Sequence, residues 1–178
     1  YGLKVGDALS RHPDVPIISF TGGTATGEKI AAVAAPMFKK LSLELGGKNP
    51  NIIFEDADFD NAVKMSTKAA FSNQGQICLC GSRLFVQDSI YDPFRSAIIE
   101  ETKSLKTGDP KDEKSNLGAV VSKSHMEKIL ICINRSKEEG GKILTGGNRL
   151  ILDGELKEGY YIEPTIIDGL TADCKTNQ

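Results

Sequence analysis

The spacing of hydrophobic positions changes several times along the chain, and each change predicts a new secondary-structure element. Short apolar runs bounded by glycine, proline or charged residues are typical of strands. Longer stretches with an apolar residue at every third or fourth position indicate amphipathic helices. By these rules strands are expected at residues 17–20, 41–45, 52–54, 84–86, 119–121, 142–144 and 160–162, and helices at residues 28–35, 59–70, 90–105 and 122–139.

Strands that alternate with helices predict an α/β fold in which neighbouring strands pair in parallel. The run at residues 41–45 alternates strictly, which places its three leucines on one face and Ser42 and Glu44 on the other. Gly46 and Gly47 close this run, and the chain forms separate groups of strands and helices before and after them. We therefore expect parts of two domains, at residues 1–46 and 47–178.

Composition narrows the class of protein. The 178 residues are 39% hydrophobic and 26% charged, with a net charge of −2, which argues against disorder. This charge balance predicts neither nucleic acid nor an anionic membrane as a partner, and no apolar run approaches the roughly 20 residues of a membrane helix. Four cysteines without a repeating framework favour a reducing compartment, so we expect a cytoplasmic protein. Their spacing, with two distant histidines, predicts no metal site.

The segment at residues 20–27, Phe-Thr-Gly-Gly-Thr-Ala-Thr-Gly, is a candidate anion site because it follows a predicted strand and opens a predicted helix. It is not a P-loop, since Glu28 and Lys29 follow Gly27 where that motif needs Lys and then Ser or Thr. It also departs from the G-x-G-x-x-G pattern, in which Thr24 takes the place of the second glycine. From the pattern alone, a simple strand-to-helix turn explains the segment equally well.

Two further residues are candidates for chemistry. Glu44 stands late in a strand beside two glycines, where α/β sheets place ligand crevices, and it could act as a general base or lie on a solvated edge. Cys78 ends the polar loop at residues 73–81, a setting typical of reactive thiols, although a buried small hydrophobe is the commoner fate of a cysteine. Cys132, in an isoleucine-rich helix, fits that second reading. The acidic run at residues 56–60 is read as a helix N-terminus.

Three segments occur together in one known family. Phe-Thr-Gly-Gly at residues 20–23, Leu-Glu-Leu-Gly-Gly-Lys at residues 43–48 and Asn-Gln-Gly-Gln-Ile-Cys at residues 73–78 resemble, in this order, the NAD(P)-dependent aldehyde dehydrogenases. The separation of the second and third motifs also fits, at 78 − 44 = 34 residues. The resemblance covers essentially the whole chain, and the Ile-Cys-Leu-Cys context most resembles the 2-aminomuconic and 2-hydroxymuconic semialdehyde dehydrogenases.

The resemblance implies a role for each matching position. Cys78 falls at the nucleophile and Glu44 at the general base, whereas Cys80 is a neighbour of the nucleophile. Gly23 departs from the many members that have serine, so one side-chain contact to the cofactor is missing here. The implied cofactor site consists of Gly22, Gly23, Thr24, Ala25, Thr26, Gly27 and Leu45.

The activity implied by the resemblance is oxidation of a small aldehyde, in particular a muconic-type semialdehyde, to its acid. The cofactor would be NAD or NADP, the intermediates would be a thiohemiacetal and a thioester on Cys78, and the protein would form a homodimer or homotetramer. Members of the family are roughly three times as long. The chain is therefore expected to be an internal piece that joins the end of a Rossmann-like cofactor domain to the first part of the catalytic α/β domain, inactive in isolation.

Two other functions remain compatible with the residues. A cysteine-dependent esterase or acyltransferase could use Cys78 as nucleophile and Glu44 as base without any nicotinamide. A protein that keeps the fold but has lost its chemistry is the third reading, and the presence of both Glu44 and Cys78 weighs against it.

Overall fold

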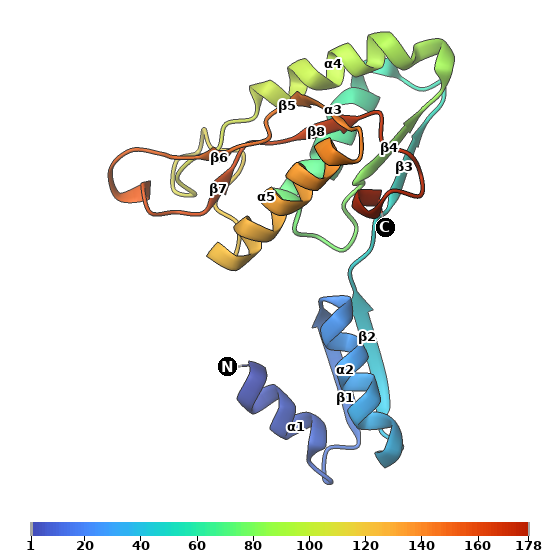
Figure 1. Ribbon diagram of the computed structural model, residues 1–178, viewed down its shortest axis with the longest axis vertical. Coiled ribbons are helices and arrows are strands. Elements are labelled where there is room, and N and C mark those ends of the chain that lie inside the picture. The colour runs from blue at the N-terminus through green and yellow to red at the C-terminus, as the bar shows by residue number, and fades with distance from the viewer. Residues whose placement is uncertain (1, 178) are drawn as a thin grey trace. The chain divides into compact units, whose positions relative to one another are not determined.

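The computed structural model describes residues 2–177 and divides into two compact units, residues 1–47 and residues 48–178 (Figure 1). No helix within residues 2–177 combines the length and apolar character needed to cross a membrane.

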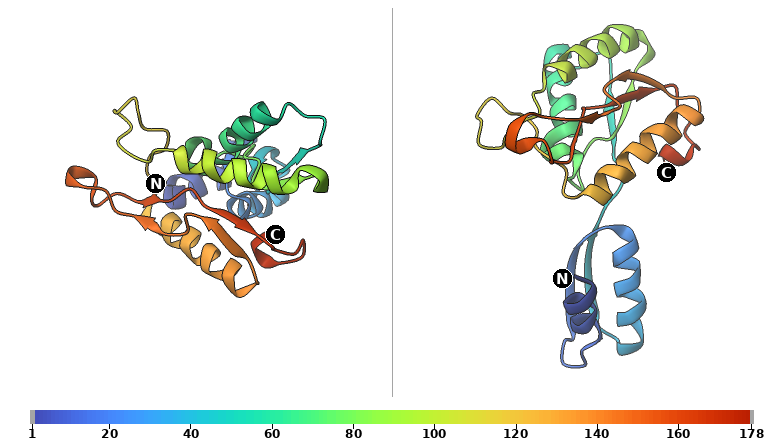
Figure 2. Two further views of the ribbon diagram at one scale, coloured as in Figure 1. Left: turned by 90° about the horizontal axis from the view of Figure 1, so that it is seen from above. Right: turned by 60° about the vertical axis from the view of Figure 1, so that its left-hand side comes forward.

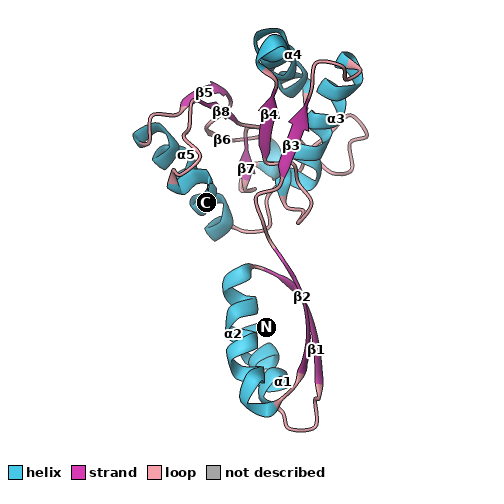
Figure 3. Ribbon diagram, turned by 90° about the vertical axis from the view of Figure 1, so that its right-hand side faces the viewer, coloured by secondary structure: helices cyan, strands magenta, loops and turns pink. Residues whose placement is uncertain are grey.

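The first unit is built around two parallel strands joined by a helix. After the short π-helix η1 (Gly2–Gly6) and α1 (Asp7–Arg11), the chain forms β1 (Ile17–Gly22), α2 (Thr24–Ala34), the 3-10 turn η2 (Ala35–Met37) and β2 (Lys40–Leu45). The register runs from Ile17 opposite Lys40 to Gly22 opposite Leu45, so both strands end at the same edge. Helix α2 covers one face of the pair (Figure 3).

Alternating hydrophobicity explains how this unit packs. In β2 the leucines are half-buried and the intervening Lys40, Ser42 and Glu44 are exposed, which confirms the predicted alternation. Helix α2 begins at Thr24, four residues before the expected start at Glu28, because Gly23 in an extended conformation serves as its N-cap. The glycine-rich segment therefore spans the end of β1, the N-cap at Gly23 and the first turn of α2 at residues 24–27.

The second unit begins with another parallel pair, β3 (Pro50–Ile53) and β4 (Arg83–Val86), connected through α3 (Phe59–Phe71) and the 3-10 turn η3 (Ser72–Gly75). The 3-10 turn η4 (Asp88–Ile90) and α4 (Tyr91–Ser104) follow. The Asp58 side chain accepts a hydrogen bond from the N–H of Asn61 (3.2 Å), which confirms the acidic run as a helix start.

The core of the second unit lies between these strands and helices. Ile53, Val63, Phe94 and Ile98 form a buried cluster, in which the Phe94 ring is fully enclosed and meets Phe59 edge-on at 5.7 Å between ring centroids. The four residues come from β3, α3 and α4. The predicted helical spacing of apolar residues in α3 and α4 therefore corresponds to the faces that build this core.

The C-terminal part differs from the expected parallel arrangement. Helix α5 (Lys123–Glu138), capped by Ser122 as predicted, packs beside β5 (Lys142–Thr145) (Figure 2). Strand β5 pairs antiparallel with β8 (Ile166–Asp168), and β6 (Arg149–Leu150) pairs antiparallel with β7 (Tyr161–Ile162). The 3-10 turns η5 (Gly154–Leu156) and η6 (Lys175–Asn177) complete the unit. Parallel pairing holds for β1 to β4 and is wrong for the predicted strands β5 and β7, whose antiparallel partners β8 and β6 were not predicted.

The predicted strand at residues 119–121 is also wrong. This segment has no regular secondary structure, and two of its N–H groups donate hydrogen bonds to unrelated partners. Val120 donates to the carbonyl oxygen of Tyr160 (2.9 Å), and Val121 donates to the side-chain oxygen of Gln76 (3.1 Å). A segment that bonds alternately to a backbone and to a side chain cannot build a strand ladder.

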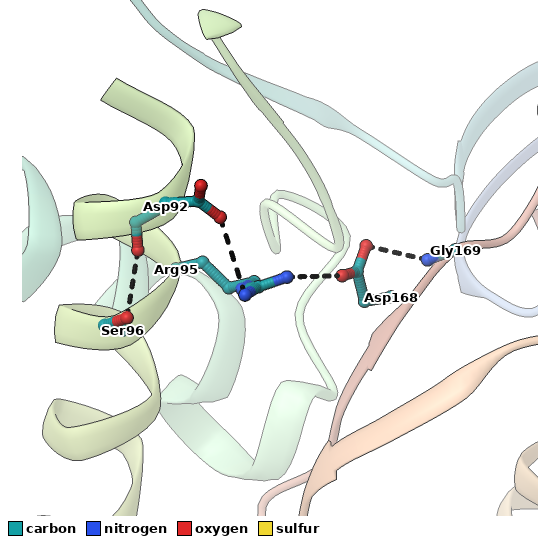
Figure 4. A network of polar contacts seen from close by, with 5 residues as sticks. All are labelled: Asp92, Arg95, Ser96, Asp168 and Gly169. Carbon is teal, nitrogen blue, oxygen red and sulfur yellow. Dashed lines mark hydrogen bonds and ion pairs between the residues drawn. The ribbon is translucent and has the colours of Figure 1, made fainter. Parts of the chain in front are cut away.

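An arginine joins α4 to β8 (Figure 4). The Arg95 guanidinium lies 3.5 Å from a carboxylate oxygen of Asp168 and 3.5 Å from one of Asp92, and it stacks over the Tyr91 ring at 5.5 Å. The Asp168 carboxylate also accepts the N–H of Gly169 (2.7 Å). Burial and the neighbouring Asp168 raise the pKa of Tyr91 above its ordinary value.

Candidate active site

Most residues of the expected cofactor site lie at one edge of the first unit. Gly22 and Leu45 end β1 and β2 opposite each other, and α2 starts two residues after Gly22. Gly23 provides no side-chain cap, and a Cβ at this position would meet no atom within 4 Å. The first N–H groups of an α-helix have no partner within the helix, so this open edge suits an anionic group.

Gly27 has a different position from the other members of this set. It is buried in α2, and a Cβ built on it would lie 2.6 Å from Cδ2 of Leu45. Thr24, Ala25 and Thr26, in contrast, are exposed in the first turn of the helix. Because Gly27 has no side chain, α2 can lie close to the end of β2. This close packing determines the position of the first turn of α2 relative to β2.

We expect Gly27→Ala to lower the free energy of unfolding by about 1–2 kcal/mol, because the added methyl overpacks the contact with Leu45. Shortening the opposing side chain should relieve the clash, so the double variant Gly27→Ala/Leu45→Ala should lose less stability than the two single changes summed. Urea unfolding of the four proteins measures this coupling. Additive losses would show that the two residues do not press on each other.

Glu44 lies next to Leu45 on the opposite face of β2. Its side chain is exposed and it pairs across the ladder with Thr21. A carboxylate at the end of a strand, one residue from the open edge, can accept a proton from a water molecule. Glu44 belongs to the first unit and Cys78 to the second.

Cys78 lies on a loop with an unusual backbone. Asn73, Gln74 and Gly75 have φ values of 50°, 56° and 71°, so three consecutive residues adopt the left-handed conformation. For a residue other than glycine this conformation costs of the order of 1–3 kcal/mol and persists only where the surroundings enforce it. Cys78 follows three residues later, with its side chain exposed.

Side-chain amides hold this loop in place. The Gln76 side-chain oxygen accepts the N–H of Val121 (3.1 Å), and the amide of Gln74, oriented to suit its neighbours, accepts the N–H of Gly118 (2.6 Å). From the other side, Nδ2 of Asn49 donates to the carbonyl oxygen of Cys78 (2.6 Å). The loop is therefore tied both to the start of β3 and to the segment at residues 118–121.

The remaining cysteines have different surroundings. Cys80 is only 7% exposed, and Cys132 and Cys174 are half-buried, so Cys78 is the exposed thiol among the four. Within residues 2–177 no three His, Cys, Asp or Glu side chains gather closely enough to hold a metal ion. This distribution makes Cys78 the thiol best placed to react with a small molecule.

The sequence motifs included Gln74, Gln76 and Cys78 but assigned no role to Asn49. Its bond partners lie 29 and 31 residues further along the chain, and local patterns carry no information about such contacts. The one available signal was its position directly after the Leu-Glu-Leu-Gly-Gly-Lys segment.

Comparison with known proteins agrees with this geometry. The model of the aldehyde dehydrogenase family matches residues 1–178, the entire chain. The chain belongs to the aldehyde dehydrogenase family. Membership of this family confirms the α/β fold class.

Individual relatives are similar along nearly the whole chain. The 2-aminomuconic semialdehyde dehydrogenase of Mus musculus is 45% identical, over 99% of this chain and 37% of the relative. The 4-trimethylaminobutyraldehyde dehydrogenase A of Danio rerio is 43% identical, over 97% of this chain and 34% of the relative. A crystal structure of Staphylococcus aureus betaine aldehyde dehydrogenase in complex with NAD+ superimposes with a TM-score of 0.95 and 42% identity, covering 100% of this chain and 35% of that one. The chain thus spans about a third of the length of these relatives.

Proposed function

We propose that the full protein carrying this chain oxidises an aldehyde to a carboxylic acid with NAD or NADP. The observation that carries the proposal is the exposed Cys78 on a braced loop, in a chain that matches the aldehyde dehydrogenase family from end to end. We assign residues 1–46 to the end of the cofactor domain and residues 47–178 to the first part of the catalytic domain. The division into compact units at Gly47 and Lys48 supports this assignment.

The edge of the first unit fits a nicotinamide dinucleotide. Gly23 leaves the backbone accessible, and the N–H groups of the exposed residues Thr24 and Ala25 at the start of α2 can meet a phosphate. The backbone of Leu45 ends the neighbouring strand at the same edge. Staphylococcus aureus betaine aldehyde dehydrogenase was crystallised with NAD+, which supports NAD as the cofactor. When bound, NAD takes up the hydride that leaves the aldehyde carbon.

The chain's own residues perform the covalent steps. The Cys78 thiolate forms a bond to the aldehyde carbon and gives a thiohemiacetal, whose oxyanion can be stabilised by the Cys78 backbone N–H. Loss of hydride from that carbon leaves a thioester on Cys78. Glu44 then accepts a proton from water as the water attacks the thioester, which releases the acid and frees the thiol.

We further propose a muconic-type semialdehyde as the substrate and a cytoplasmic homodimer or homotetramer as the working form. The substrate rests on the similarity to 2-aminomuconic semialdehyde dehydrogenases and on the Cys-Leu-Cys context at residues 78–80. The compartment rests on four cysteines that form no disulfide. Measuring kcat/KM for a muconic semialdehyde, 4-trimethylaminobutyraldehyde and betaine aldehyde tests the proposed substrate. A higher kcat/KM for either of the two quaternary ammonium aldehydes would overturn the substrate proposal.

Aldehyde-dependent formation of NADH by the full protein tests the proposed reaction. We expect NADH and acid to form in equal amounts. Hydrolysis of an activated ester without any NADH from aldehydes would instead favour the cysteine-dependent esterase. An inert protein whose Cys78 reacts with iodoacetamide no faster than Cys132 would favour a fold that has lost its chemistry.

A further inference from the structure

We propose that Asn49 is a positioning residue that sets the direction of the Cys78 side chain. Its Nδ2 donates to the carbonyl oxygen of Cys78 (2.6 Å) and to the carbonyl oxygen of Cys80 (3.2 Å). An asparagine amide nitrogen carries two N–H groups, so both donors are used on this one loop. The importance of this contact for catalysis rests on the function proposed above, whereas the contact itself does not.

Asn49 is itself firmly held. Its carbonyl oxygen accepts the N–H of Arg83 (3.1 Å), a bond that belongs to the first pair of the β3–β4 ladder, Pro50 opposite Arg83. The Arg83 side chain also donates through Nε to the carbonyl oxygen of Lys48 (2.8 Å). The amide that reaches the cysteine loop therefore projects from the fixed end of a strand.

The bond to the Cys78 carbonyl has a direct consequence for the thiol. Fixing a carbonyl oxygen fixes the peptide plane that follows the residue, and this restricts ψ of Cys78. With ψ restricted, the Cα–Cβ bond keeps one direction relative to β3. The second bond holds the turn in which Cys80 donates to the carbonyl oxygen of Ile77 (3.1 Å). A nucleophile held in one direction needs less reorganisation when it attacks, because misplacement by about 1 Å can cost about 10²-fold in rate.

Asn51 offers a matched control. It lies in β3, two residues after Asn49, and its Nδ2 donates to the Ser66 hydroxyl (3.0 Å) in α3 rather than to the cysteine loop. Asn49→Asp and Asn51→Asp are isosteric and add the same charge. An aspartate at position 49 has no N–H to donate, so both hydrogen bonds to the carbonyl oxygens of Cys78 and Cys80 are lost. An aspartate at position 51 can still accept a hydrogen bond from the Ser66 hydroxyl.

The test measures backbone hydrogen exchange and steady-state kinetics on the full protein. For Asn49→Asp we expect exchange in a peptide covering residues 76–82 to rise at least about tenfold. We also expect kcat to fall about 10–100-fold, with KM for NAD within about twofold of the wild type. Asn51→Asp should leave both the exchange of this peptide and kcat within about twofold. If Asn49→Asp does not fold, Asn49→Ser, which keeps one donor, should give changes of intermediate size.

Three results would overturn the inference. Unchanged exchange in Asn49→Asp would show that the amide does not hold the loop. Equal increases in both variants would show general loosening of β3. Faster exchange with an unchanged kcat would show a contact that does not position the thiol. If the loop loosens selectively but the wild type oxidises no aldehyde, the positioning of Cys78 stands and the proposed function fails.

Discussion

Cys78→Ser in the full protein should lower aldehyde-dependent NADH formation by at least about 10³-fold. A thiolate is a much stronger nucleophile than a neutral hydroxyl, and serine needs an adjacent base to be activated. Among residues 2–177 the thiol at position 78 is the exposed one, so no other cysteine of the chain is expected to replace it. Steady-state rates measured from NADH absorbance at saturating aldehyde and NAD give the ratio.

Cys132→Ser is the control for this change. It makes the same chemical substitution in α5, at a half-buried position, and should keep activity within about twofold. Both variants should bind NAD like the wild type, because the expected cofactor residues all lie in the first unit. Activity of Cys78→Ser above about a tenth of the wild type, with a folded protein, would remove Cys78 from the nucleophile's role.

Glu44→Gln should affect a later step. We expect steady-state turnover to fall about 10²–10⁴-fold, because the amide cannot accept the proton of the attacking water. Attack by Cys78 and loss of hydride do not need this base, so the first turnover should still yield one NADH per site before the reaction stalls. Rapid mixing and the amplitude of the NADH burst measure this directly.

Ser42→Ala serves as the control for Glu44→Gln. Ser42 lies two residues earlier on the same exposed face of β2, and its loss should leave both the burst and the steady state unchanged within about twofold. A Glu44→Gln protein that turns over normally would show that another group accepts the proton. Loss of the burst together with the steady state would place Glu44 in an earlier step than thioester hydrolysis.

Local patterns were sufficient to predict the elements that pack through one face. The alternation in β2, the Asp58 and Ser122 caps and the apolar faces of α3 and α4 all follow from residues a few positions apart, and the structure confirms them. The secondary-structure predictions are wrong where hydrogen-bond partners far away in the sequence determine the conformation. The segment at residues 119–121 has strand-like residues but bonds to Tyr160 and Gln76 instead of a ladder. Strands β6 and β8 were not predicted, because two and three residues are too few to show a period.

In the candidate site, too, residues within local motifs could be predicted from the sequence, whereas contacts between distant residues could not. Glu44, Cys78 and the glycine-rich segment were found because they lie in compact motifs, and their roles remain proposals. The early start of α2 was missed because a glycine N-cap gives a weaker signal than serine or aspartate. The contacts of Asn49 and the packing of Gly27 under Leu45 were missed because they join residues far apart in sequence. These are the contacts that determine how the motif residues are held.

Peptide mass spectrometry of acid-quenched Glu44→Gln protein during turnover tests the central claim most directly. If Cys78 carries the acyl intermediate, the peptide containing residue 78 should gain the mass of the acyl group derived from the aldehyde supplied. This adduct should form only when NAD is present, since without hydride loss the thiohemiacetal reverses on quenching. An acyl group on Cys80, Cys132 or Cys174, or no adduct while NADH still forms, would contradict the assignment of Cys78 as the nucleophile.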